Sequence, residues 1–204
     1  MFTGIVRTIG KLRGLTPLGG DLRLEIDAGG LAAEQYAAGD SVAVNGCCLT
    51  VAEARPGGFC ADVSRATLAL TTFGGLAVGA AVNLEPALTL ASPLGGHLVS
   101  GHVDGVGTIA NRHTEGRSLR FEIKVPAELG RYIAHKGSVC VDGVSLTVNA
   151  VHDSQFDVNV IPHTLAHTVL QHWEPGTRVN LEVDLVARYL ERLLAGAAQN
   201  GEST

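Results

Sequence analysis

The chain has 204 residues, of which 46% are hydrophobic and 17% charged, a balance that excludes an intrinsically disordered protein. A net charge of -5, lysine only at Lys11, Lys124 and Lys136, and 4% aromatic residues argue against a nucleic-acid-binding surface. No apolar run reaches the roughly 18 residues that span a bilayer, and the N-terminus lacks the pattern of a secretory signal, so we expect a cytoplasmic protein.

Short β-strands dominate the first half of the chain. Residues Asp21–Asp27 alternate polar and apolar side chains strictly, as a strand with one buried face does. The segment Arg55–Gly58 has the proline and glycines of a hairpin turn. We expect further strands at Thr3–Leu12, Ser41–Asn45, Cys48–Ala54, Phe59–Ser64 and Val82–Leu88, and short helices at Gly30–Ala37 and after Thr67.

The second half of the chain repeats the first at an interval of about 97 residues. Asn45–Val51 aligns with Asp142–Val148, and Val82–Glu85 aligns with Val179–Glu182. Roughly 27 of about 86 aligned positions are identical, and no gap is needed. The repeat predicts an all-β chain of two tandem, six-stranded antiparallel barrels with a Greek-key-like order, joined near Ser92–Gly96.

The C-terminal tail has no counterpart in the first repeat. Apolar residues recur at helical spacing from Leu185 to Leu194, with charged residues between them. This pattern predicts an α-helix that either packs on its own barrel or associates with copies of itself. The chain thus divides into one barrel at 1–97, a second at 98–185, and a helix and tail at 186–204.

Four positions carry different chemical groups in the two repeats. Ile5 aligns with His102, Asn45 with Asp142, Cys48 with Ser145 and Ala66 with His163. These differences predict two similar pockets with unequal roles, one with a thiol and the other with a hydroxyl, an imidazole and a carboxylate. His102 is a candidate proton-transfer group, because an imidazole titrates near neutral pH. Cys48 is a candidate nucleophile, proton carrier or small wall residue.

Other chemistry is less well supported by the residue spacing. The four cysteines include no CxxC pair, and we expect reduced thiols with no disulfide framework. Histidines cluster between His163 and His172 without an HExxH frame, so we expect no bound metal. Ser145, His102 and Asp142 could form a hydrolase triad, but the chain has no nucleophile-elbow motif.

Five sequence blocks, in order, resemble those of the riboflavin synthase family. They are Met1–Val6, Asn45–Val51, Gly95–Gly105, Asp142–Val148 and Ile161–Leu165. The resemblance implies that each barrel binds one molecule of 6,7-dimethyl-8-ribityllumazine. It also implies a transferase that dismutates two of these molecules, in which one gives a four-carbon unit to the other and yields riboflavin and 5-amino-6-ribitylaminouracil. No cofactor and no metal are implied.

The same resemblance implies a homotrimer that assembles through the C-terminal helix. Each active site would lie between the N-terminal barrel of one subunit and the C-terminal barrel of a neighbour, and Lys136 would reach in from that neighbour. Lumazine synthase is a further partner that the family suggests.

The family's ligand-contacting positions map onto equivalent stretches of both repeats. In the first barrel the resemblance implies Gly4, Ile5, Val6, Ser41, Cys48, Leu49, Thr50, Asp62, Val63, Ser64, Arg65, Ala66 and Thr67. In the second barrel it implies Gly101, His102, Val103, Ser145, Leu146, Thr147, Asn159, Val160, Ile161, Pro162, His163 and Thr164. We assign proton transfer or nucleophile activation to Cys48 and His102, and orientation of the substrate to Asp142, Ser145 and Thr147.

Three positions depart from the family pattern, and two alternative functions remain open. Ala66, Pro86 and Pro93 stand where many relatives have glutamate, arginine and arginine, which concerns the first pocket and the inter-barrel junction. The chief alternative is a non-catalytic lumazine or flavin carrier of the same fold, against which the presence of His102, Ser145 and Thr147 argues. The other is the flavin-binding barrel of a reductase, but the chain has no nicotinamide-binding βαβ fingerprint.

Overall fold

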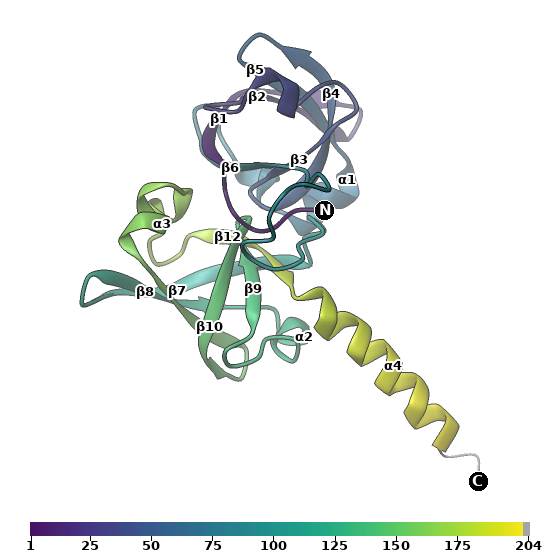
Figure 1. The fold of residues 1–204 in the computed structure, drawn as a ribbon, viewed down its shortest axis with the longest axis vertical. Coiled ribbons are helices and arrows are strands. Elements are labelled where there is room, and N and C mark those ends of the chain that lie inside the picture. The colour runs from purple at the N-terminus through teal and green to yellow at the C-terminus, as the bar shows by residue number, and fades with distance from the viewer. Residues whose placement is uncertain (202–204) are drawn as a thin grey trace.

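A computed structural model describes the backbone of residues 1–201 and the side chains of residues 1–195. It contains two closed barrels, each of six antiparallel strands, followed by one long helix (Figure 1). Around the first barrel the strand order is β1-β2-β5-β4-β3-β6, and the second has the same order with β7 in the place of β1. The predicted fold of two tandem six-stranded barrels with a C-terminal helix is therefore confirmed.

The first barrel and its short helices occupy the first repeat. They are β1 (Thr8–Leu18), β2 (Asp21–Asp27), η1 (Ala33–Gln35), β3 (Ser41–Val44), β4 (Cys47–Arg55), β5 (Gly58–Val63), α1 (Arg65–Leu70), η2 (Phe73–Gly75) and β6 (Ala81–Pro86). The hairpin predicted at Arg55–Gly58 joins β4 to β5, with Arg55 opposite Gly58.

The second barrel repeats this series of elements. They are β7 (Gly105–Glu115), β8 (Ser118–Lys124), α2 (Ala127–Gly130), β9 (Ser138–Val141), β10 (Val144–His152), β11 (Gln155–Val160), α3 (Pro162–Ala166), η3 (Val169–His172) and β12 (Arg178–Val183). Helix α4 (Leu185–Gly201) follows directly.

Each barrel encloses its own hydrophobic core, because alternate residues of every strand point inward. Phe59 and Leu84 are fully buried in the first barrel, and Phe121 packs edge-on against Trp173 in the second, with ring centroids 5.2 Å apart. Burial of each such side chain contributes about 1.5–3 kcal/mol. A third, small cluster of Phe2, Ala43, Val99 and Cys140 lies between the barrels.

Two predicted elements differ from the structure. The first strand begins at Thr8, not Thr3, because the residues before it leave the first barrel and cross to the second, as described below. The helix predicted at Gly30–Ala37 is reduced to the single turn η1, since Leu31 and Tyr36 both insert into the first-barrel core.

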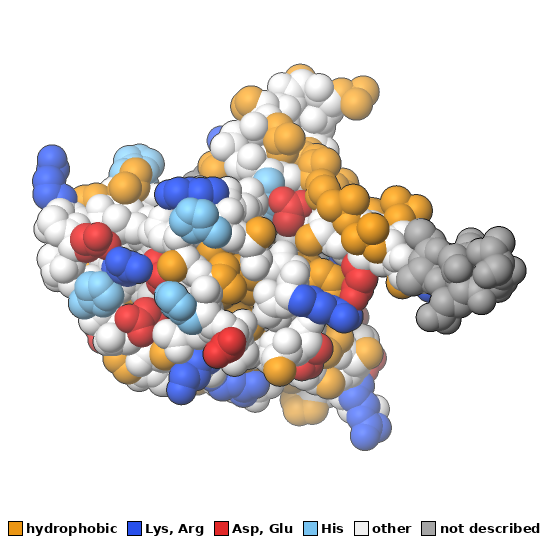
Figure 2. Space-filling model, turned by 90° about the horizontal axis from the view of Figure 1, so that it is seen from below, with side chains coloured by type: hydrophobic (Ala, Val, Ile, Leu, Met, Phe, Trp, Pro, Cys, Tyr) orange, Lys and Arg blue, Asp and Glu red, His pale blue; other side chains and the backbone are white. Residues whose placement is uncertain are grey.

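Helix α4 extends away from both barrels (Figure 1). Its first turns contact the second barrel, where Arg188 pairs with Asp104 and Glu191 pairs with Arg131. Hydrophobic side chains gather where the helix leaves the body of the molecule (Figure 2). They are each more than half exposed, and they are Val186, Tyr189, Leu190, Leu193 and Leu194. The apolar face of α4 is therefore not packed on its own barrel. No helix in the described residues is both long and apolar enough to cross a membrane.

Candidate functional site

The two repeats exchange their leading segments. The backbone N–H of Ser145, on β10 of the second barrel, donates to the carbonyl of Gly4 at 2.7 Å. In the mirror arrangement, the N–H of Cys48, on β4 of the first barrel, donates to the carbonyl of Gly101 at 2.7 Å. Residues 1–7 thus contact the second barrel at Gly4 before they return to their own, and residues 98–104 contact the first at Gly101; we call these two stretches the crossing segments.

Glycine is required where each crossing segment meets the opposite barrel. Gly4 has φ +73° and Gly101 has φ +80°, in the left-handed region that disfavours residues with a side chain. A Cβ added at Gly4 would lie 2.7 Å from the Cβ of Ser145, and one at Gly101 would lie 2.6 Å from the Cβ of Cys48. The absence of both side chains therefore lets the backbone touch the strands that carry the thiol and the hydroxyl.

A buried carboxylate holds each crossing segment at its base. Glu85 accepts hydrogen bonds from the N–H and hydroxyl of Thr3 and from the N–H of Gly4. Glu182 accepts the equivalent three from Ser100 and Gly101. Burial raises the pKa of both carboxyl groups, and these hydrogen bonds oppose the shift. The two anchors fix both segments in the same geometry.

This exchange reverses two expectations from the sequence, which placed Gly4, Ile5 and Val6 in the first barrel and Gly101, His102 and Val103 in the second. Gly4 contacts Ser145 of the second barrel, and Val6 packs against the second-barrel core, with Ile5 between them in sequence. Gly101 contacts Cys48 of the first barrel, and Val103 packs against the first-barrel core, with His102 between them in sequence. The expectation was wrong because position in the sequence does not reveal that a segment crosses between domains.

The first-barrel site therefore brings a thiol beside the crossing segment that carries an imidazole. Cys48 is partly exposed on β4, next to the backbone of Gly101, and His102 follows Gly101 with an exposed side chain. The other three cysteines are buried: burial raises the pKa of Cys47 to about 12 and that of Cys140 well above its usual range. Cys48 is thus the cysteine best placed to meet a ligand.

The other positions predicted for this site lie on β3, β4 and β5 and on the first turn of α1. Thr50 is exposed on β4 opposite Ser41 of β3, and Ser64 accepts a hydrogen bond from the N–H of Thr67 at the start of α1. Asp62 pairs with Arg23, which lowers the pKa of the carboxyl group. Arg65 and Ala66, on the first turn of α1, are exposed, whereas Leu49 and Val63 are buried in the barrel core and can offer a ligand only their backbone.

The second-barrel site combines a hydroxyl with a buried imidazole. The Oγ of Ser145 lies 2.7 Å from Nδ1 of His97, and burial lowers the pKa of His97, which favours the neutral ring. The other ring nitrogen, Nε2, is buried and has no hydrogen-bond partner among the described residues. A neutral imidazole in this position can exchange a proton with the serine hydroxyl.

Sequence reasoning missed the role of His97. Its position has no counterpart in the first repeat, so comparison of the repeats could not reveal it. The sequence offers only the glycine before it, and the structure explains that glycine: a Cβ at Gly96 would lie 2.1 Å from the carbonyl oxygen of Thr3 and 2.8 Å from the Cβ of Ser145. Such crowding marks a segment pressed against the site.

The remaining positions predicted for the second-barrel site lie on β10, β11 and α3, and in the loop before β9. Thr147 is exposed on β10, and His163 stacks on His167 with ring centroids 4.3 Å apart on α3. Asn159, Ile161 and Pro162 are exposed, and Thr164 is half-buried. Leu146 and Val160 are buried in the barrel core. Lys136 is exposed with φ +63° in the loop before β9.

Asp142 lies in the junction between the barrels. Its carboxylate accepts from the N–H of Asn180 at 2.8 Å and from Nε1 of Trp173 at 3.1 Å, and burial raises its pKa to about 7. Its carbonyl accepts from the side chain of Asn83, just as the carbonyl of Asn45 accepts from that of Asn180. Asp142 can therefore orient Ser145 only indirectly, through the turn that begins β10.

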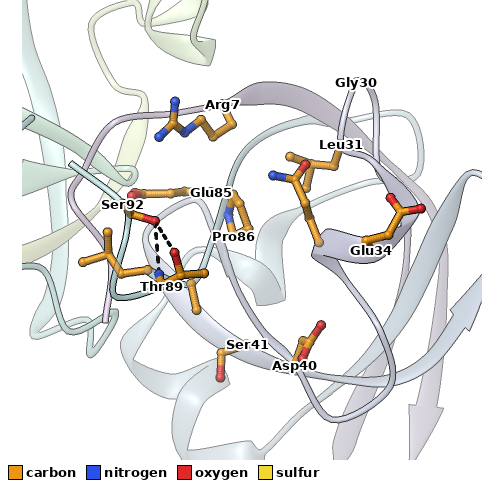
Figure 3. Close-up of a pocket in the computed structure, with 13 residues that line it drawn as sticks. Arg7, Gly30, Leu31, Glu34, Asp40, Ser41, Glu85, Pro86, Thr89 and Ser92 are labelled. Atoms are coloured by element: carbon orange, nitrogen blue, oxygen red, sulfur yellow. Dashed lines mark hydrogen bonds between the residues drawn. The ribbon is translucent and has the colours of Figure 1, made fainter. Parts of the chain in front are cut away.

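A cavity of about 630 Å³ adjoins the first-barrel site (Figure 3). Ser41 lines its edge together with Arg7, Glu34 and Glu85, whereas Cys48 is not among its lining residues. The carboxylate of Glu85 is already engaged by the crossing segment. In the described residues no group of three or more His, Cys, Asp or Glu side chains is arranged to hold a metal ion.

Comparison with known proteins matches both repeats to one family. The lumazine binding domain matches residues 3–87 and 100–184. The riboflavin synthase of Mycobacterium tuberculosis is 46% identical over 201 residues, which are 97% of this chain and 100% of that protein. The riboflavin synthase of Photobacterium phosphoreum is 44% identical over 194 residues, which are 95% of this chain and 89% of that protein.

Solved structures of LumP resemble the whole two-barrel body. LumP complexed with riboflavin gives a TM-score of 0.83 at 31% identity, covering 90% of this chain and 99% of that one. LumP complexed with 6,7-dimethyl-8-(1'-D-ribityl) lumazine gives a TM-score of 0.81 at 30% identity, with the same coverage.

Proposed function

Because this chain belongs to the lumazine binding domain family and its curated relatives are riboflavin synthases, we propose that it is a transferase that dismutates 6,7-dimethyl-8-ribityllumazine. One molecule gives a four-carbon unit to the other, so that riboflavin and 5-amino-6-ribitylaminouracil together contain all the atoms of the two substrates. The reaction therefore consumes no oxidant and no reductant. The observation that carries the proposal is the pair of sites in one frame, one with Cys48 and His102 and the other with Ser145 and His97.

Two sites with different side chains suit a reaction in which identical molecules have different fates. Holding both molecules converts a bimolecular encounter into an effectively unimolecular step, which can supply about 7–11 kcal/mol of the barrier. The methyl group at C7 of the lumazine is acidic because the ring delocalises the resulting anion, so a modest base is sufficient. We assign proton transfer to His102 and Cys48 at the first-barrel site.

At the second-barrel site we assign orientation and proton exchange to Ser145, with His97 as its partner. The exposed hydroxyl of Thr147, on the same face of β10, would bind polar atoms of the ligand, as Thr50 would in the first barrel. Asp142 supports the turn between β9 and β10.

The proposal includes a homotrimer in the cytoplasm. The exposed apolar face of α4 supports association of copies through this helix, and Lys136, exposed before β9, would complete a neighbour's site. Deletion of the residues beyond Leu185 should reduce the particle mass to that of one subunit, as measured by light scattering. An unchanged mass would rule out this mode of assembly. Association with lumazine synthase is tested by co-sedimentation of the two proteins.

The activity is tested by incubating the full chain with the lumazine alone, without metal or nucleotide. We expect the absorbance of riboflavin to appear, at one riboflavin for every two lumazine molecules consumed. A carrier would bind the lumazine and leave it unchanged, which is the outcome that contradicts an enzyme.

A further inference from the structure

The two crossing segments end in different side chains. At the end of the first, the N–H of Arg7 donates to the carbonyl of Leu84, and at the end of the second the N–H of Asp104 donates to the carbonyl of Leu181. Beyond this shared bond the repeats diverge, because the aligned positions hold a guanidinium in one and a carboxylate in the other.

The carboxylate of Asp104 makes two contacts that the first repeat cannot make. It accepts from the N–H of Val183 at 2.8 Å, and it pairs with Arg188 on α4. In the first repeat Pro86 stands in the place of Val183 and has no N–H to donate. The side chain of Asp104 is only 9% exposed, so its partners are fixed more firmly than those of a surface ion pair.

Asp104 lies on the side of His102 opposite the Glu182 anchor. Glu182 holds Ser100 and Gly101 before His102, and Asp104 holds the chain two residues after it. His102 is therefore held between two fixed points, and Gly101 between them contacts Cys48. The second of these points, Asp104, also contacts α4 through Arg188.

Building on the function proposed above, we propose that Asp104 is a positioning residue for the first-barrel site, and that Arg188 couples helix α4 to the segment that carries His102. The contact between Arg188 and Asp104 is a charge-assisted hydrogen bond. It joins α4, whose apolar face is exposed, to the crossing segment whose Gly101 contacts Cys48. Small displacements of a catalytic group are costly, since a misplacement of about 1 Å can reduce the rate about 100-fold.

The test uses the full chain with Arg188→Gln and Asp104→Asn, and three comparisons. Arg188→Lys keeps the charge. Arg192→Gln is the matched control, because Arg192 is exposed on the same helix and makes no ion pair with the residues whose side chains are described. Glu191→Gln removes the charge that α4 pairs with Arg131 of the second barrel, next to Tyr132, without touching Asp104.

Two measurements are made on each variant: kcat and KM for the lumazine, and the rate of alkylation of Cys48 by iodoacetamide. The second does not depend on turnover, and the burial of the other cysteines directs the reagent to Cys48. We expect Arg188→Gln and Asp104→Asn to reduce kcat by about 3- to 10-fold with little change in KM, and to alter the alkylation rate several-fold. Arg188→Lys should recover most of the loss, and the double variant should be no worse than Asp104→Asn alone.

Unchanged alkylation and kcat in Arg188→Gln would overturn the proposal, as would an equal loss in Arg192→Gln or Glu191→Gln, since that would indicate a general effect of the helix. A loss that accompanies a smaller particle mass, with normal alkylation of Cys48, would also overturn it. If the unaltered chain forms no riboflavin, the proposed function fails, and the alkylation rates still decide whether Arg188 acts on this segment.

Discussion

The two barrels have the same backbone around their sites but different reactive side chains. In each, a crossing segment from the other repeat lies against the strand after a tight turn, held by a glycine carbonyl and a buried glutamate. The strand residue at that contact is Cys48 in one barrel and Ser145 in the other. The backbone geometry that places a ligand has thus been kept, and the groups that would react with it differ.

The imidazoles differ in the same way. His102 is exposed and follows Gly101 on the segment that crosses to the first barrel, while His97 is buried and contacts Ser145. An exposed imidazole can meet a ligand directly, whereas a buried one acts through the hydroxyl that it contacts. Each candidate site therefore contains residues from both repeats, so that each half of the chain needs the other to form its site.

The largest effect should come from removing the reactive groups of one site. Proton transfer by a positioned side chain typically contributes 10²–10⁴-fold, so we expect His102→Gln to lower kcat by about 100-fold, and Cys48→Ala to cause a comparable loss. The measurement is the steady-state rate of riboflavin formation. His152→Gln, at the exposed end of β10, is the control. Full turnover in either site variant would remove the assignment of that residue.

The crossing segments can be tested with a matched set of glycine substitutions. Gly4→Ala and Gly101→Ala combine a left-handed φ with overlap of the opposite strand, and we expect each to lower the free energy of unfolding by about 2–4 kcal/mol. Gly116→Ala has φ +61° but open space around it, so it should cost only about 1–2 kcal/mol. Urea unfolding measures all three.

Riboflavin titration of the same variants separates the sites. Because Gly4 contacts Ser145 and Gly101 contacts Cys48, Gly4→Ala should weaken the second-barrel site and Gly101→Ala the first. If each substitution instead weakened the site of its own repeat, the crossing described here would be wrong.

The repeat made the fold predictable from sequence alone. Two aligned copies with turns at equivalent positions indicate two equal domains, and alternation in Asp21–Asp27 indicates a strand with one buried face. The alignment of Cys48 with Ser145, and the chemical difference between them, could also be predicted, because both follow from the sequence alone. These features depend either on the local sequence or on the alignment of the two repeats, and the sequence alone supplies each of them.

The crossing could not be predicted, because it depends on contacts between residues far apart in sequence. Gly4 pairs with Ser145 and Gly101 with Cys48, and a segment that stays in its barrel has the same local sequence pattern as one that leaves it. Asp142 was expected to orient the substrate, but its buried carboxylate accepts from Trp173, in the second-barrel core, and from Asn180, whose side chain reaches across to Asn45. Burial of that kind is decided by tertiary packing.

The smallest predicted effect concerns the junction between the barrels, where the first repeat has Asn45 and the second Asp142. Burial raises the pKa of Asp142 to about 7 in the folded chain, above its ordinary value of 3.8. Its contribution to stability is therefore fully present below pH 3.8 and is lost as the pH rises through 7. Since the unfolded chain binds no proton there at neutral pH, we expect the unaltered chain to lose about 1.4 kcal/mol between pH 6 and pH 8 from this group.

Asp142→Asn should remove that loss, because an amide does not titrate. The amide can still accept from the N–H of Asn180 but leaves Nε1 of Trp173 without its carboxylate partner, so the variant is expected to be less stable at pH 6. The measurement is therefore the difference in unfolding free energy between variant and unaltered chain at the two pH values, in which the titration of Glu85 and Glu182 cancels. If that difference is the same at pH 6 and pH 8, Asp142 does not change its charge in this range. The second repeat would then hold an ionised carboxylate where the first holds a neutral amide, and the asymmetry between the barrels would extend into their junction at every pH tested.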